Sequence, residues 1–79
     1  MEDAVCAECT MLYQKALDAI IRHNYIRSRL AMAKLQRDTP KIRVLEPVVR
    51  HLYQARSAAI RAYQEHIDTH TAKAAQRGV

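Results

Sequence analysis

The chain has 79 residues and a formal net charge of +5 at pH 7, with one Gly, two Pro, four Tyr and neither Phe nor Trp. A chain of this length forms one domain with a small core, and it usually needs a metal, a disulfide or a second subunit for stability. The scarcity of turn residues excludes a sheet of useful size, and the many Ala, Arg, Leu and Gln residues predict an all-α fold.

The positive charge is concentrated in the middle of the chain. Residues 22–61 contain ten Lys or Arg against two acidic residues, whereas residues 1–21 contain one Lys against four acidic residues. A basic segment of this kind is most often a solvated face, and the sharper interpretation is a surface for nucleic acid or an acidic protein. A small basic nucleic-acid-binding regulator is therefore the alternative function.

The N-terminal residues and the hydropathy bear on location. The chain begins Met1-Glu2-Asp3, and no apolar segment typical of a signal peptide follows. No apolar run reaches the length of a membrane span. We therefore expect a cytoplasmic protein with no membrane partner.

The first predicted helix covers residues 4–37, where neither Gly nor Pro interrupts the chain. Apolar residues recur there at spacings of three and four, and they form a stripe wide enough to contact more than one neighbour. His23 lies on this stripe, and we interpret it as a hydrogen-bonded interface residue rather than a metal ligand. The main row of the stripe is Val5, Cys9, Leu12, Ala16, Ala19, His23, Ile26, Leu30 and Ala33.

The strongest break in the chain is Asp38-Thr39-Pro40. Thr39 is a suitable N-cap and Pro40 a suitable first helical residue, so a turn at about 38–41 and a second helix over about 41–75 are expected. Pro47 removes a backbone donor and predicts a kink in that helix. The alternative is that residues 40–45 form a loop and the second helix begins near Pro47.

The second helical pattern is clear from Val48 onward, and His66 and His70 continue its apolar stripe, whereas we expect His51 to face solvent. Two helices of this length, about 45 Å each, predict an antiparallel helical hairpin. With a turn centred near Thr39, positions whose numbers sum to about 78 face each other. Because two helices bury only one seam, the wide stripes favour pairing with a second copy into a dimeric four-helix bundle.

The antiparallel arrangement brings the two ends of the chain together, and each end carries half of a metal site. Cys6 and Cys9 form a C-x2-C pair, and His66 and His70, one helical turn apart, form an H-x3-H pair. Two thiolates and two imidazoles are a ligand set that zinc prefers in tetrahedral structural sites. In this register, five further residues lie close enough to hydrogen-bond to the ligands as outer partners, without binding the metal themselves: Glu8, Tyr13, Tyr63, Glu65 and Asp68.

Other interpretations of these residues remain open. Cys6 and Cys9 are also acceptable as small buried apolar residues, and His70 as an exposed residue near a helix end. A redox dithiol is a further alternative, although the βαβ context of such motifs is absent. A haem attachment motif would need His at position 10, where the chain has Thr10.

The chain shows no catalytic constellation, because it has no Gly-rich phosphate loop, no serine with a matching base and no Glu-x-x-His pair. We therefore expect a protein that is not an enzyme and has no small-molecule substrate. The function that the sequence favours is a structural or interaction module, in which zinc joins the ends of a helical hairpin.

Overall fold

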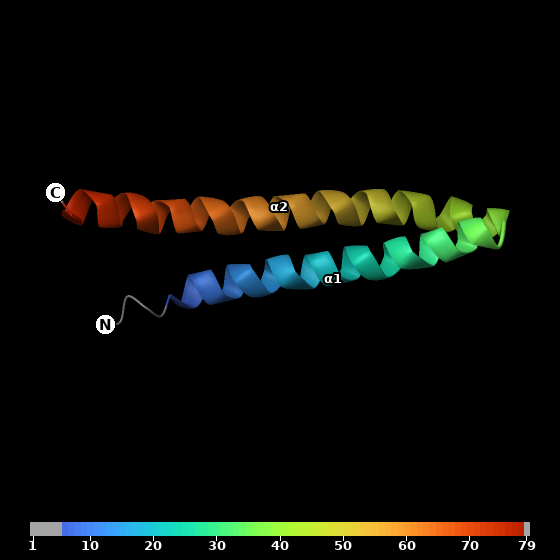
Figure 1. Cartoon of the computed structure of the whole chain (residues 1–79), viewed down its shortest axis with the longest axis horizontal. Coiled ribbons are helices and arrows are strands. Elements are labelled where there is room, and N and C mark those ends of the chain that lie inside the picture. The colour runs from blue at the N-terminus through green and yellow to red at the C-terminus, as the bar shows by residue number, and fades with distance from the viewer. Residues whose placement is uncertain (1–5, 79) are drawn as a thin grey trace.

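The computed structural model describes residues 6–78 and, within them, the side chains of residues 6–71. Two helices make up the fold: α1 spans Ala7–Leu35 and α2 spans Thr39–Gly78. They run antiparallel and pack against each other, with the turn at one end and the start of α1 beside the last part of α2 at the other (Figure 1). The molecule is 60 Å long and 18 by 15 Å across. The predicted all-α hairpin is confirmed.

The turn is closed by backbone hydrogen bonds at the end of α1. Arg37 has a φ of 55°, in the left-handed region that usually favours Gly. Its N–H donates to the carbonyl of Lys34 over 3.2 Å, and the N–H of Asp38 donates to the carbonyl of Ala33 over 2.9 Å. This pair of bonds is a Schellman motif, which satisfies two carbonyls that the helix end leaves free. The chain therefore reverses within three residues, 36–38.

Asp38, rather than the expected Thr39, is the N-cap of α2. Its carboxylate accepts a hydrogen bond from the backbone N–H of Lys41 over 3.3 Å, and its carbonyl accepts one from Ile42 over 3.0 Å. Asp is at least as good an N-cap as Thr, and the left-handed residue before it has already turned the chain. The connection therefore lies two to three residues earlier than the expected 38–41.

The bounds of both helices differ slightly from the sequence-based expectation. α1 ends at Leu35 instead of 37, and the predicted positions 4 and 5 lie outside the described residues. α2 begins at Thr39 and continues through Pro47 to Gly78, so the structure has the earlier of the two starts considered (Figure 1). The helical rise of residues 39–46 is what brings His66 and His70 of α2 level with the cysteines at the start of α1.

Contacts between the helices follow the expected register, in which paired residue numbers sum to about 78. Close to the turn, Lys34 Nζ lies 3.8 Å from a carboxylate oxygen of Glu46. Near the other end, the rings of Tyr13 and Tyr63 meet with their centroids 5.7 Å apart. The register therefore holds from the turn to the open end of the hairpin.

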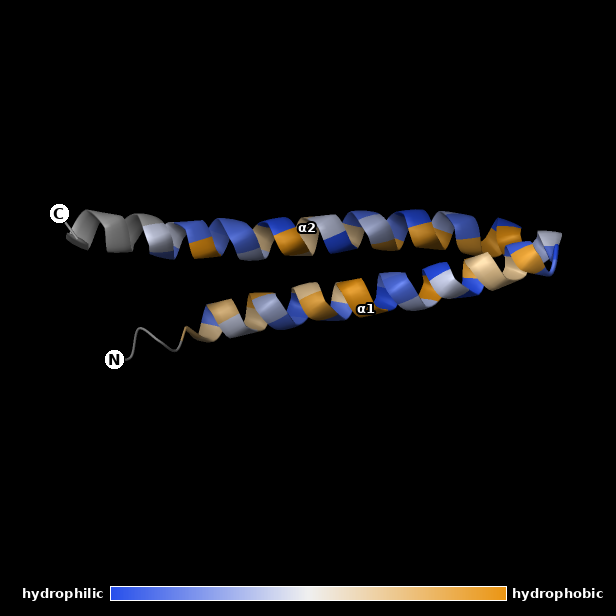
Figure 2. Cartoon of the chain, viewed as in Figure 1, coloured by the Kyte–Doolittle hydropathy of each residue, from blue (hydrophilic) through white to orange (hydrophobic). Residues whose placement is uncertain are grey.

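The core between the helices is thin. Within the part of the chain whose side chains are described, the buried apolar residues are Ala16, Leu30 and Ala33. Hydrophobic segments recur along the whole length of α1 (Figure 2), yet many large side chains stay exposed. Over its described residues, neither helix has the length and apolar character that a membrane crossing requires. The exposed large apolar residues are Met11, Tyr13, Leu17, Ile21, Tyr25, Met32, Leu35, Val44, Val48 and Tyr53.

His23 is the one buried polar residue of this interface among those described, with 4% of its surface exposed. Its Nδ1 lies 3.1 Å from a guanidinium nitrogen of Arg56, which is always a donor, so Nδ1 accepts and the proton of the neutral ring is on Nε2. The ring of Tyr53 lies 5.6 Å away, centroid to centroid. His23 is thus a hydrogen-bonded interface residue, as predicted, and His51 is exposed, as expected.

Burial, together with the charges of Arg56 and Arg27, lowers the pKa of His23 below its ordinary value of 6.5. The unfolded chain therefore takes up a proton that the folded chain resists. The contribution of neutral His23 to the free energy of unfolding is therefore present above pH 6.5 and is lost as the pH falls below that value. We expect His23→Gln, which keeps an acceptor for Arg56 but does not titrate, to remove this part of the acid sensitivity.

The measurement is a series of thermal melts between neutral and mildly acidic pH, with chelator present so that protonation of metal ligands does not contribute. The exposed His51→Gln is the matched control, and it should melt like the parent at every pH. A His23→Gln protein whose melting temperature falls with acid as steeply as that of the parent would contradict this assignment.

Candidate metal centre

The first half of the site is built by the start of α1. Cys6 is the N-cap of the helix, with φ −106° and ψ 114°, and its Sγ accepts a hydrogen bond from the backbone N–H of Cys9 over 3.3 Å. Because an N-cap side chain bonds the N–H three residues later, the C-x2-C spacing and the helix start are one feature. Both sulfur atoms therefore lie at the positive end of the helix dipole, which favours thiolates.

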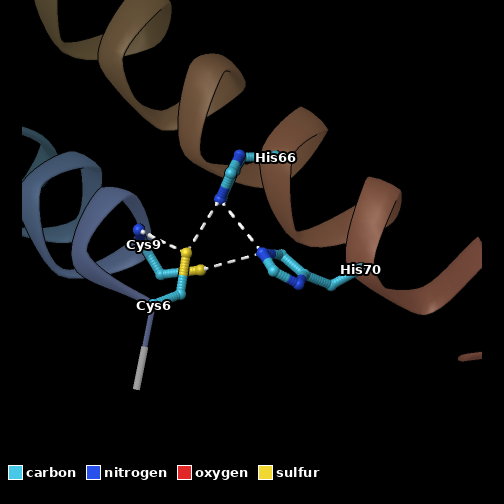
Figure 3. Close-up of side chains that lie close together, drawn as sticks. All are labelled: Cys6, Cys9, His66 and His70. Carbon is cyan, nitrogen blue, oxygen red and sulfur yellow. Dashed lines mark hydrogen bonds between the residues drawn. The ribbon is translucent and has the colours of Figure 1, made fainter. Parts of the chain in front are cut away.

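The second half of the site comes from α2. His66 and His70 are one turn apart on the side of α2 that faces the start of α1, and their rings are nearly perpendicular, with centroids 4.7 Å apart. The two Nε2 atoms point toward each other at 3.1 Å (Figure 3). Two nitrogens this close need a proton or a cation between them, since two lone pairs facing each other repel.

The two halves meet across the hairpin. Cys6 Sγ lies 3.3 Å from His66 Nε2, and Cys9 Sγ lies 3.4 Å from His70 Nε2 (Figure 3). All four ligand atoms fall within 4.8 Å of one another. A tetrahedral zinc with ordinary bond lengths has sulfur–nitrogen edges of about 3.6 Å and a nitrogen–nitrogen edge of about 3.3 Å. The two sulfur–nitrogen distances and the nitrogen–nitrogen distance given above are within a few tenths of an ångström of these values, so the cluster is consistent with binding of a tetrahedral metal ion.

The thiols of the site have opposite pKa shifts. The hydrogen bond with His66, followed by those with the side chain and backbone N–H of Cys9, lowers the pKa of Cys6 to about 6. The hydrogen bond with Cys6, burial and the charge of Cys6 raise the pKa of Cys9. The pair thus holds one thiolate and one thiol near neutral pH. A metal ion would replace the remaining protons, because ligation needs thiolates and neutral imidazoles.

Glu8 is the outer partner that the structure places at the site. One of its carboxylate oxygens lies 3.9 Å from His66 Nδ1, and the side chain is largely exposed. A carboxylate on this side favours a proton on Nδ1, so Nε2, on the side of the sulfur atoms, is the nitrogen that would bind a metal. Among the described residues, the side chains of Glu65 and Asp68 form no hydrogen bond or ion pair with the two histidines. The pair Tyr13–Tyr63 packs beside the site without bonding to it.

The structure brings all four predicted side chains together. Cys6, Cys9 and His66 are half-buried and His70 is exposed, so the cluster is accessible from solvent. No family model, no curated protein and no solved structure matches this chain. The argument for a metal therefore depends on the chemistry and geometry of these four residues.

We expect Glu8→Gln to weaken zinc binding, because an amide does not hold the Nδ1 proton of His66 as a carboxylate does. The carboxylate is exposed and not in direct hydrogen-bond contact, so the loss should be about threefold to tenfold, at or below the low end of the range for outer partners. Competition with a chromophoric chelator measures it. Glu65→Gln carries the same charge change nearby and should bind zinc like the parent; an equal loss in both variants would show a general charge effect.

Proposed function

We propose that this chain is a zinc-stapled helical hairpin that acts as a structural or interaction module, with Cys6, Cys9, His66 and His70 as the zinc ligands. The observation that supports it is the convergence of four ligand atoms, from both ends of the chain, within 4.8 Å. All four tetrahedral positions are filled by protein, which leaves none open for substrate and is typical of structural sites. Cobalt or iron would accept the same ligands, and zinc is the best match to sulfur and nitrogen together.

A metal ion at this position would stabilise the open end of the hairpin, which is the least stable part of the fold. Helix ends fray, and nothing covalent holds the open end of the hairpin. The core offers little compensation, because Leu30 is the one large apolar residue among the buried residues that are described, and the others are Ala16 and Ala33. Ligation would close a loop of some sixty residues and so remove much of the entropy of the unfolded chain. Metal binding and folding are coupled in this design.

The main competing chemistry for the cysteine pair is a redox dithiol. A lowered pKa at Cys6 and a position at a helix N-terminus are features that such dithiols share. The two imidazoles favour a metal over a redox dithiol, because each sulfur lies within 3.4 Å of a histidine Nε2. A dithiol has no need of two convergent nitrogens held 3.1 Å apart.

Pairing with a second copy is the remaining part of the proposal. The chain exposes 6306 Å², whereas a compact monomer of 9.1 kDa would expose about 4900 Å². The difference exceeds the roughly 800 Å² that each partner buries in a standard interface. One face of α1 supplies the apolar surface, and we call it the outer stripe. Its members are Met11, Leu17, Ile21, Tyr25, Met32 and Leu35, all exposed.

We expect Cys9→Ser and His66→Ala to lose stoichiometric zinc and to lower the melting temperature by about 5 °C or more. Fraying should be confined to the first turns of α1 and to residues 65–78, because the register near the turn does not depend on the site. Elemental analysis and thermal melts with and without chelator measure both effects. His51→Ala is the control and should keep its zinc. A parent protein that purifies without zinc, binds none when it is added and melts identically in chelator would overturn the proposal.

For the second copy, we expect sedimentation equilibrium at micromolar concentration to give twice the chain mass of 9.1 kDa. Ile21→Lys combined with Met32→Lys should give a monomer, because charges would be buried in the apolar interface. Gln54→Lys combined with Ala58→Lys adds the same charge to exposed positions of α2 and should leave the dimer intact. A parent that sediments as a clean monomer would remove the second copy from the proposal while leaving the zinc site untouched.

A further inference from the structure

A second site lies in the middle of the hairpin, in a groove between α1 and α2. The groove has a volume of about 620 Å³ and opens to solvent. His23 is fourteen residues from Cys9 along α1, so the groove is about 20 Å from the candidate metal centre. We call it the basic groove, and the residues that line it are His23, Arg27, Glu46, Val49, Arg50 and Tyr53.

The lining of the groove includes a hydrogen-bond donor with no protein acceptor among the described residues. The Nδ1 of His23 is taken by Arg56, which leaves the proton of the neutral ring on Nε2. Within the described residues, no protein atom accepts from that Nε2, and the ring is one of the groups that line the groove. The imidazole is 4% exposed and held between Arg56 and the ring of Tyr53, so its orientation is set by its surroundings.

The walls of the groove carry positive charge that the chain does not neutralise. Arg27 is on α1 and Arg50 is on α2, both are exposed, and neither has an acidic partner among the described residues. Among the described residues, Glu46 supplies the one carboxylate of the lining, and that carboxylate lies 3.8 Å from Lys34 Nζ. Burial, followed by the charges of Arg56 and Arg27, lowers the pKa of His23, so the ring stays neutral beside these arginines.

We propose that the basic groove binds a phosphate group, with Arg27 of α1, Arg50 of α2 and the Nε2–H of His23 as its donors. Planar guanidinium groups match phosphate oxygens in pairs, and they keep their charge at every physiological pH. A buried neutral imidazole adds a donor of fixed direction. The volume accommodates a phosphate with a small organic group attached. The phosphate can come from a small ester or from the backbone of a nucleic acid.

The test follows the His23 ring signals by NMR at constant ionic strength, as potassium phosphate replaces potassium chloride. We expect a saturable shift in the millimolar range, and a loss of affinity of about tenfold or more in Arg27→Gln and Arg50→Gln. Arg22→Gln removes the same charge from an exposed position of α1 that does not line the groove, and it should change the affinity less than about twofold. The titration is repeated in chelator, where the proposal predicts the same result.

Two further probes identify the source of the phosphate. Phenyl phosphate that competes with inorganic phosphate, together with no competition by a short single-stranded oligonucleotide, would assign the groove to small phosphate esters. Competition by the oligonucleotide that disappears in Arg27→Gln and Arg50→Gln would assign it to a nucleic-acid backbone. The absence of a saturable shift at His23 up to tens of millimolar phosphate would overturn the proposal. Equal weakening by Arg22→Gln would overturn it as well, since binding would then follow overall charge.

Discussion

The tight reversal between the two helices determines which residues can meet along the rest of the molecule. The Schellman bonds of Arg37 and Asp38 end α1, and the carboxylate of Asp38 starts α2 in the next residue. Each residue added there would rotate α2 by about 100° and move it by about 1.5 Å. His23 would then no longer face Arg56, and the imidazoles would turn away from the thiols. A short polar turn therefore controls the geometry of a site at the opposite end of the hairpin.

The candidate metal site could be predicted because its chemistry is carried by residue type and short-range spacing. Cys6 with Cys9, and His66 with His70, each place two ligands on one helical turn without any knowledge of the partner segment. Their meeting then follows from helical continuity, since two uninterrupted helices of this length can only place their far ends side by side. Pro47 was the one real obstacle to that inference, and the helix continues through it.

Other features depend on tertiary detail that the residue pattern does not carry. Thr39 and Asp38 are both good N-caps, and the choice between them depends on the left-handed conformation of Arg37. That conformation could not be predicted from the sequence, because Arg37 is not a glycine. From the sequence, Arg27 and Arg50 are interpreted as solvated charges, because 22 intervening residues separate them. Only the register of the two helices places them on the same groove. One signal was available: a histidine on an apolar stripe four residues before an arginine marks a polar position within the seam.

The antiparallel register also implies an order of events in time. Contacts near the turn join residues a few positions apart, whereas the thiols and imidazoles are separated by sixty residues, so the entropy of closing each successive contact rises toward the open end. The hairpin should therefore assemble from the turn outward and reach the ligand cluster last. A metal ion would then bind only to molecules in which the two helices are already paired along their whole length. If the cluster binds a metal, the rate of metal uptake would therefore report how fast folding is completed.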